Sequence, residues 1–262
     1  MKVVALLYHD VVQPGRLNSS GFAGHAADEC KLDRNTFREH LSSISRATQR
    51  PIERLRLPLQ MEGDERLLLT FDDGGVTAYT ETADLLEEHG YRGHFFITSD
   101  YIDSPRFVTR QQLRELQARG HVIGTHSASH PARIGGCRWE VLLDEWASSA
   151  TKLADILGAP VTIASIHGGY FRPRLAEAAA LSGIRVLFTS EPTTVCREIY
   201  GCTVVGRFCV RRGMSAGAAG QIARGDKLPR AKQWLDWKLR QAVKSTMSAF
   251  HAPTAQYSAA ID

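Results

Sequence analysis

The 262-residue sequence is poor in cysteine and has no CxxC pair. Its five cysteines are Cys30, Cys137, Cys196, Cys202 and Cys209. An odd number without metal-ligand spacing favours reduced thiols over a disulfide framework or a cysteine-ligated zinc site. A disulfide between Cys196 and Cys202 remains an alternative.

The sequence also lacks a long hydrophobic run. The N-terminal stretch "MKVVALLYHDVV" turns polar at Tyr8 and His9, too early for the core of a signal peptide, and we interpret it as a strand. No segment has the length of a membrane span. From these absences we expect a cytoplasmic protein.

Charge of one sign is not in excess either. The formal net charge is only +4, from 32 basic and 28 acidic residues. There is no block of Lys and Arg and no basic stretch interleaved with aromatics, so nucleic acid is not an expected partner. With 43% hydrophobic residues, the chain can bury the core of a single domain.

What the sequence does have is a regular alternation of apolar runs and amphipathic helical patterns. Short buried strands that alternate with helices ending in glycine are typical of βα units around a parallel sheet or barrel, so we predict an α/β fold. Strands are expected at 3–8, 67–71, 93–98, 121–126, 161–166 and 185–190, and helices at 80–90, 109–120, 138–158 and 172–183. We assign residues 1–226 to the barrel, 227–250 to an amphipathic C-terminal helix packed on or beside it, and 251–262 to a flexible tail.

Polar residues gather where these predicted strands end. In parallel α/β folds the carboxyl ends of the strands share one face, where active sites form. We therefore expect side chains that are distant in sequence to meet there. They are Tyr8, His9, Asp72, Asp73, Thr98, Ser99, His126, His167, Ser190 and Glu191.

The segment "GTHSASHP" has the sharpest pattern, because His126 and His130 are four residues apart. On a helical turn, two imidazoles at this spacing share one side, and a carboxylate from another strand end would complete three ligands for a metal. Alone, the spacing would fit two surface histidines equally well. The adjacent acids of "LLLTFDDGG", Asp72 and Asp73, favour the metal site.

The motifs "TFDDG" and "HSASHP" resemble the first two motifs of the NodB-homology polysaccharide deacetylases, carbohydrate esterase family 4. The resemblance implies a single-domain distorted (β/α) barrel. It also implies a divalent metal held by Asp73, His126 and His130, zinc in the first place, with Co²⁺, Ni²⁺ or Mn²⁺ as alternatives. Asp72 would be the catalytic base.

The function that this resemblance implies is hydrolysis. A metal-bound water would attack and remove an N-acyl group, acetyl in the first place, from an amino sugar in a saccharide, a glycolipid precursor or a glycosylated metabolite. An O-deacetylase and a catalytically impaired carbohydrate-binding relative are the alternatives.

The third family motif is altered in this sequence. In "SIHGGYFRPR", Ser165 stands in place of the family arginine that orients the base, and His167 in place of the motif proline. The backbone N–H of Gly168 would donate to the oxyanion. Arg172 could reach back to Asp72 or be a solvated residue before a helix that begins at Pro173.

The histidine of the last family motif, which protonates the leaving amine, has no counterpart after Cys209. His167 is our candidate for this acid, with His9 and His25 as alternatives. A structural role is an equally good interpretation of each of these histidines.

Partners are less sharply indicated. We expect sugar contacts at Tyr8, His9, Tyr170 and Glu191, since aromatic faces and carboxylates suit sugar rings and hydroxyls. The C-terminal helix either docks on the barrel or makes peripheral contact with an anionic membrane surface. Its apolar side would carry Trp234, Leu235, Leu239, Val243 and Met247. The sequence does not indicate an oligomeric state.

Overall fold

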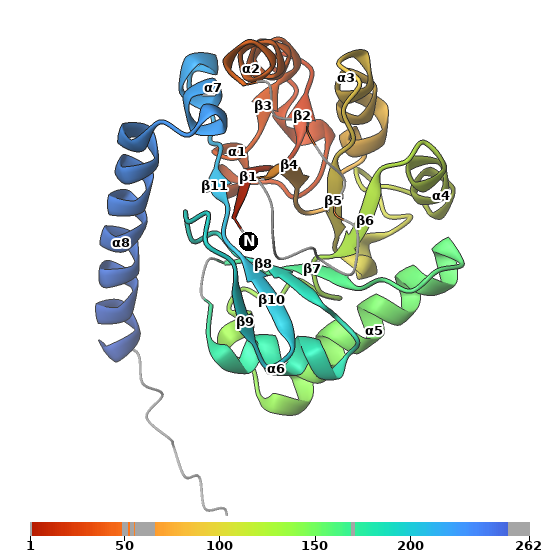
Figure 1. Cartoon of the computed structure of the whole chain (residues 1–262). Coiled ribbons are helices and arrows are strands. Elements are labelled where there is room, and N and C mark those ends of the chain that lie inside the picture. Colours follow the sequence, from red (N-terminus) through yellow and green to blue (C-terminus); the bar gives the residue numbers. More distant parts are fainter. Residues whose placement is uncertain (1, 49–51, 53–54, 56–65, 169–170, 251–262) are drawn as a thin grey trace, which may run out of the picture.

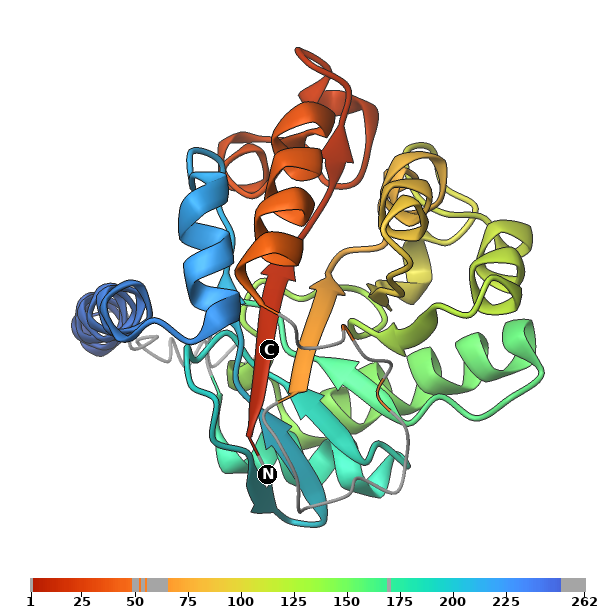
Figure 2. The same ribbon diagram turned by 45° about the horizontal axis from the view of Figure 1, so that its top comes forward.

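A curled, mainly parallel sheet covered on its outer side by helices forms the body of the protein (Figures 1 and 2). The structure is a computed structural model that describes residues 2–48, 52, 55, 66–168 and 171–250, with side chains up to residue 242. The strand order of the main sheet is β11-β1-β4-β5-β6-β7-β8-β10-β9. All its pairs are parallel except β9 with β10. This confirms the predicted α/β fold of barrel type.

The elements are short. The strands are β1 Val3–Tyr8, β2 Val11–Val12, β3 Leu32–Asp33, β4 Arg66–Phe71, β5 His94–Ile97, β6 Val122–Thr125, β7 Ile163–Ser165, β8 Val186–Phe188, β9 Arg197–Ile199, β10 Cys202–Val205 and β11 Phe208–Cys209. The α-helices are α1 His25–Asp28, α2 Arg34–Ala47, α3 Ala83–Glu88, α4 Arg110–Ala118, α5 Trp139–Leu157, α6 Pro173–Leu181, α7 Ala216–Arg224 and α8 Lys227–Phe250. A π-helical turn precedes α3, and three short 3₁₀ turns lie in loops.

The predicted strands and helices are confirmed at their positions, and their ends show why. Gly90, Gly120, Gly158 and Gly183 all have positive φ, the conformation that closes a helix most cheaply when there is no Cβ. The N-terminus of α4 has a capping box made by Thr109 and Gln112. Pro173 begins α6, as predicted.

Alternation along the strands separates two apolar layers. Every second residue of a strand packs against the outer helices; Val4 of β1 and Leu67 and Leu69 of β4 are examples. The residues between them fill the concave side, which holds Val3, Ala5, Leu68, Phe96, Ile163, Val186, Phe188 and Val205. If this alternation continues past the end of a strand, a polar residue at a concave-side position will therefore lie at the mouth of the curled sheet.

Two absences concern the part of the chain that the structure describes. None of its helices combines the length and apolar character that a membrane-spanning helix needs. All five cysteines are free in the described residues, Cys196 and Cys202 included.

The concave core leaves no room at Gly124 in β6, so we expect Gly124→Ala to be destabilising. A Cβ there would lie 2.6 Å from Phe96 Cδ1 and 2.8 Å from Ile163 Cγ1. Overpacking of this kind costs about 1–3 kcal/mol of the free energy of unfolding, measurable by urea denaturation. Gly136→Ala is the matched control, because its Cβ would meet only Arg133 Cβ at 3.9 Å. Equal stability of the two variants would contradict this packing.

Candidate active site

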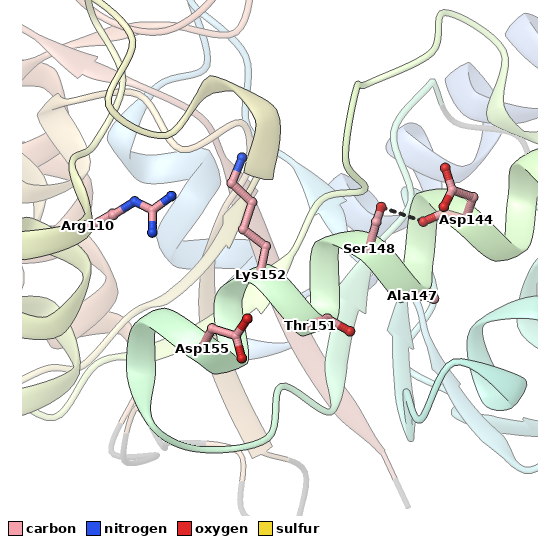
Figure 3. Close-up of a pocket in the computed structure, with 7 residues that line it drawn as sticks. All are labelled: Arg110, Asp144, Ala147, Ser148, Thr151, Lys152 and Asp155. Atoms are coloured by element: carbon pink, nitrogen blue, oxygen red, sulfur yellow. Dashed lines mark hydrogen bonds between the residues drawn. The ribbon is translucent and has the colours of Figure 1, made fainter.

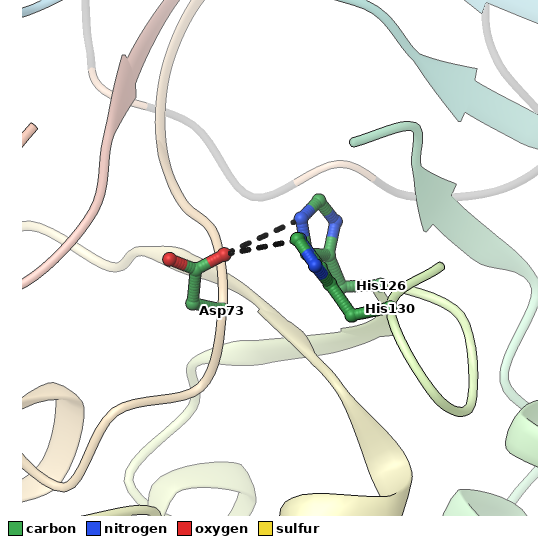
Figure 4. A group of neighbouring side chains, drawn as sticks. All are labelled: Asp73, His126 and His130. Carbon is green, nitrogen blue, oxygen red and sulfur yellow. Dashed lines mark ion pairs between the residues drawn. The ribbon is translucent and has the colours of Figure 1, made fainter. Parts of the chain in front are cut away.

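Asp73, His126 and His130 meet at the mouth of the sheet (Figure 4). One ligand atom from each lies within 4.8 Å of the others. Asp73 Oδ1 is 3.5 Å from His126 Nε2 and 3.8 Å from His130 Nε2. Asp73 and His126 are buried, while the His130 ring is partly exposed. This is the group predicted from the sequence as a metal site.

The two histidines are not on a helical turn, and that expectation is wrong. They lie in a loop after β6, in which Ser127 and His130 have φ of 66° and 59°. Asp73, after β4, also has a positive φ of 78°. Non-glycine residues adopt this region at a cost, so the surrounding structure must hold them there.

Glu145 of α5 holds the loop between the histidines. Its Oε2 accepts hydrogen bonds from the backbone N–H groups of Ala128 (2.9 Å) and Ser129 (3.0 Å), and its Oε1 accepts one from Ser129 Oγ at 2.5 Å. The carboxylate is buried. A buried acid whose hydrogen bonds go to one turn fixes the conformation of that turn.

These donors fit a divalent cation. His126 Nδ1 lies 3.0 Å from the carbonyl oxygen of Ser165. Because a carbonyl only accepts, Nδ1 carries the proton and Nε2 can present a lone pair to a metal. The Asp73–His126 separation of 3.5 Å is close to the roughly 3.4 Å between ligands of a tetrahedral zinc.

The protonation states of these three side chains follow from their burial and from neighbouring charges. Burial lowers the pKa of His130 to about 4, together with the charge of His126, so this ring is neutral near pH 7. Burial would raise the pKa of Asp73, but hydrogen bonding to His126 and the nearby histidine charges hold it below its ordinary value. The pKa of His126 is raised because Asp72 and Asp73 outweigh its burial. A cation would therefore displace a proton from His126.

Asp72 is held by an arginine that sequence reasoning missed. Arg207, between β10 and β11, donates from Nη1 to Asp72 Oδ1 (2.7 Å) and from Nη2 to Asp72 Oδ2 (2.9 Å). Ser165 Oγ donates to Oδ2 at 2.9 Å and accepts from Arg207 Nη2 at 2.7 Å. Ser165 thus assists an arginine that comes from another strand end. Arg172, the alternative, is an exposed N-cap residue of α6.

Every N–H of the Arg207 guanidinium has a partner. Besides the three bonds to Asp72 and Ser165, Nε donates to the Thr189 carbonyl at 3.0 Å and Nη1 to Thr70 Oγ1 at 3.3 Å. The side chain is fully buried, with its guanidinium carbon 5.6 Å from the centre of the Phe96 ring. Burial would raise the pKa of Asp72, but the Arg207 charge and His126 bring it below its ordinary value.

The candidate acid His167 lies against the metal-site histidines. Its ring stacks on His130 with centroids 4.1 Å apart, and its Nε2 is 3.3 Å from Ser127 Oγ. Burial lowers its pKa to about 2, helped by the charges of His126 and His130. Its Nδ1 has no hydrogen-bond partner among the described residues. A neutral imidazole with one uncommitted nitrogen therefore borders the site.

The remaining predicted residues differ in how near they lie to the two aspartates. His9 is close enough for its charge to act on both Asp72 and Asp73, and Gly168 lies in an exposed turn with a φ of 74°. Glu191 pairs with Arg197 at 2.5 Å. The alternative acid His25 is exposed at the start of α1.

Tyr8 does not face the site. It is fully buried among Phe37 and Phe71, and its hydroxyl lies 3.3 Å from His40 Nδ1. We therefore do not retain it as a substrate contact. Tyr170 lies outside the described residues. Phe22, which sequence reasoning did not single out, packs with its ring centre 4.7 Å from that of His130 and so lies beside the candidate metal group.

A hollow elsewhere on the molecule carries no catalytic pattern. It has a volume of about 470 Å³ and runs along the outer face of α5 (Figure 3). Its lining is mixed in charge, and Lys152 is 3.7 Å from Asp100 Oδ1. The chemistry is concentrated at the strand ends instead.

Comparison with known proteins agrees with the resemblance. The model of the family described as "Polysaccharide deacetylase" matches residues 60–187, a range that includes Asp72, Asp73, His126 and His130 but not Arg207. YxkH of Bacillus subtilis (strain 168), which carries the same family name, is 23% identical over 224 residues, covering 84% of this chain and 75% of that protein.

Solved structures resemble the fold. IcaB from Ammonifex degensii has a TM-score of 0.67 at 19% identity, over 86% of this chain and 97% of that one. The Streptococcus pyogenes deacetylase PplD in complex with acetate has a TM-score of 0.63 at 17% identity, over 82% and 95%. The predicted resemblance is therefore confirmed, and at these identities the structures support the fold alone.

The contacts of Glu145 predict an effect on metal affinity. We expect Glu145→Ala to weaken the binding of a zinc probe by about 10- to 100-fold, because the turn between His126 and His130 loses the carboxylate that holds it. An effect of this size is common for residues that orient metal ligands. Competition with a chromophoric chelator measures this, and circular dichroism checks folding. Glu140→Gln, an exposed change on the same helix, is the control. A folded Glu145→Ala protein with unchanged affinity would contradict this role.

The Arg207–Asp72 pair predicts an effect on rate and pH dependence. Arg207→Lys keeps the charge but loses the two parallel hydrogen bonds, and we expect turnover to fall roughly 100-fold. Because Arg207 lowers the pKa of Asp72, the acidic limb of the pH–rate profile should move to higher pH.

Arg172→Lys is the matched control for Arg207→Lys and should leave the rate and profile unchanged. Ser165→Ala is the milder variant, which should shift the limb in the same direction. An Arg207→Lys protein with parental rate and profile would refute the positioning role.

Proposed function

We propose that this chain, which resembles the polysaccharide deacetylases over residues 60–187, is a metal-dependent hydrolase that removes an acetyl group from the nitrogen of an amino sugar. The observation that supports this proposal is that a second carboxylate lies beside a possible metal site. A three-residue metal-type group, Asp73, His126 and His130, adjoins a second carboxylate, Asp72, whose Oδ2 is 3.9 Å from His126 Nε2. A module that only binds sugar has no need of that second acid.

Asp73, His126 and His130 would hold the cation, and two imidazole nitrogens with one carboxylate are a typical zinc set. When bound, a divalent cation polarises a carbonyl oxygen and lowers the pKa of water. The His126 tautomer supports this assignment, since Ser165 fixes which nitrogen is available. Zinc is our first choice, ahead of Co²⁺, Ni²⁺ and Mn²⁺.

Asp72 takes the proton of the attacking water in this proposal. A carboxylate offers about four acceptor positions, and Arg207 and Ser165 use three of those of Asp72. One position is left for a water hydrogen. The three fixed bonds hold the base in place, so little reorganisation is needed before proton transfer.

Stabilisation of the oxyanion and protonation of the amine are assigned first to two residues that follow β7. The backbone N–H of Gly168 would stabilise the negative charge that develops on the carbonyl oxygen. His167 would supply the proton to the departing amine, with His9 as the alternative. Since its ring is neutral, His167 would release a proton to the amine from one nitrogen and accept at the other, through solvent, the proton that Asp72 took from the attacking water.

We propose that the substrate is an N-acetylated amino sugar within a saccharide, a glycolipid precursor or a glycosylated metabolite. His9 and Glu191 would contribute polar contacts to its hydroxyls. Residues 1–226 would form the catalytic barrel, to which α8 is appended.

Release of acetate is the direct test. We expect mass spectrometry to detect it from members of a panel of N-acetylated sugars, nucleotide sugars and lipid-linked sugars, and a chelator to abolish it. Asp73→Asn and His126→Ala should lose the metal. Asp72→Asn should keep the metal and lose at least about 100-fold in turnover, because only the base is removed.

Asp144→Asn, an exposed change on α5, is the matched control and should behave as the parent. A protein that binds metal but releases acetate from none of the panel would support a binding protein instead. Release from O-acetyl esters alone would support an O-deacetylase.

A further inference from the structure

The C-terminal helix α8 is attached to the body by polar contacts along one side. It lies outside α7 in both views (Figures 1 and 2). Arg230 donates from Nη2 to the Ile222 carbonyl at 2.8 Å and stacks 5.3 Å from the Phe208 ring centre. Gln233 Nε2 donates to the Cys209 carbonyl at 3.0 Å. Polar side chains of α8 thus make these contacts with the body.

The apolar side of α8 faces away from the body. Leu228, Leu235 and Leu239, here called the leucine stripe, are 84%, 54% and 58% exposed, and Trp234 is 46% exposed. Spacings of seven and four residues put the three leucines on one side of a helix. The amphipathic helix predicted from the sequence is present, but the leucines that would dock it on the barrel are left outside.

Charge is concentrated on this helix. Six of the 32 basic residues and only one of the 28 acidic residues lie in 227–250. The segment therefore carries a formal charge of +5, while residues 1–226 have as many basic as acidic residues. Lys232 and Lys238 are exposed beside the leucine stripe, and Lys238 Nζ lies 5.3 Å from the Trp234 ring centre.

We propose that α8 is a membrane-surface helix, which inserts the leucine stripe between the headgroups of anionic lipids and pairs its lysines and arginines with their phosphates. A helix with an apolar stripe, flanking basic residues and tryptophan is the type that lies in the bilayer interface. A second copy of this chain is a poorer occupant, because pairing two stripes would bring two segments of +5 together. This inference is independent of the proposed function.

Vesicle co-sedimentation of the full chain tests the proposal. The vesicles are phosphatidylcholine alone, and phosphatidylcholine mixed with phosphatidylglycerol. We expect binding to the mixed vesicles only, weakened at least about tenfold by high salt because the headgroup attraction is screened. Leu235→Ser with Leu239→Ser should weaken it at least about tenfold, and so should Lys232→Glu with Lys238→Glu.

Two matched controls lie on the body. Leu181→Ser changes a leucine of α6 that is 69% exposed, and Arg185→Glu reverses an exposed charge near it. Both should bind the mixed vesicles as the parent does. Absence of binding, equal binding to both vesicle types, or retained binding in the α8 variants would overturn the proposal. So would a dimer in light scattering that the leucine substitutions abolish, since the stripe would then belong to a second copy.

Discussion

The ion pair between Arg207 and Asp72 joins strands from opposite parts of the sheet. Arg207 precedes β11, while its partners Asp72, Ser165 and Thr189 follow or end β4, β7 and β8. A buried carboxylate without a partner is strongly destabilising, whereas one with a bidentate arginine and a hydroxyl is compensated. The curvature of the sheet brings these residues together, and their bonds in turn hold its concave side. The geometry of the site and the packing of the barrel thus depend on one contact.

The sequence predicted the parts of the fold that repeat. Strands β1 and β4 to β8 and the helices between them follow from apolar periodicity and from glycines past the helix ends. Strands β2, β3 and β9 to β11 were not predicted, because β2 and β3 are only two residues long and no helix separates β9, β10 and β11. Arg207 was missed with them, because its partner is 135 residues away. The alternation could have indicated it, because Arg207 comes two residues after Val205, which faces the concave side.

The spacing of residues in the sequence could not predict the local geometry of Asp73, His126 and His130. His126 and His130 approach one another because Ser127 and His130 take left-handed backbone conformations, not because a helix places them there. Nothing in a four-residue interval distinguishes these two routes. The loop depends on Glu145, which belongs to a helix that begins nine residues after His130. Tertiary contacts of this kind decide conformations that are locally unfavourable.

The two adjacent acids show how a strand end can serve two purposes. Alternation would send Asp72 and Asp73 to opposite sides, but the positive φ of Asp73 turns its side chain back. Both carboxylates then face His126, at 3.9 and 3.5 Å. Their charges are compensated differently. Asp72 has a permanent partner in Arg207, whereas the charge partners of Asp73 in the described part of the chain are histidines, which can lose their protons. Asp72 can therefore stay ionised and in place whether or not a cation is bound, whereas the proposed cation would replace protons as the charge partner of Asp73.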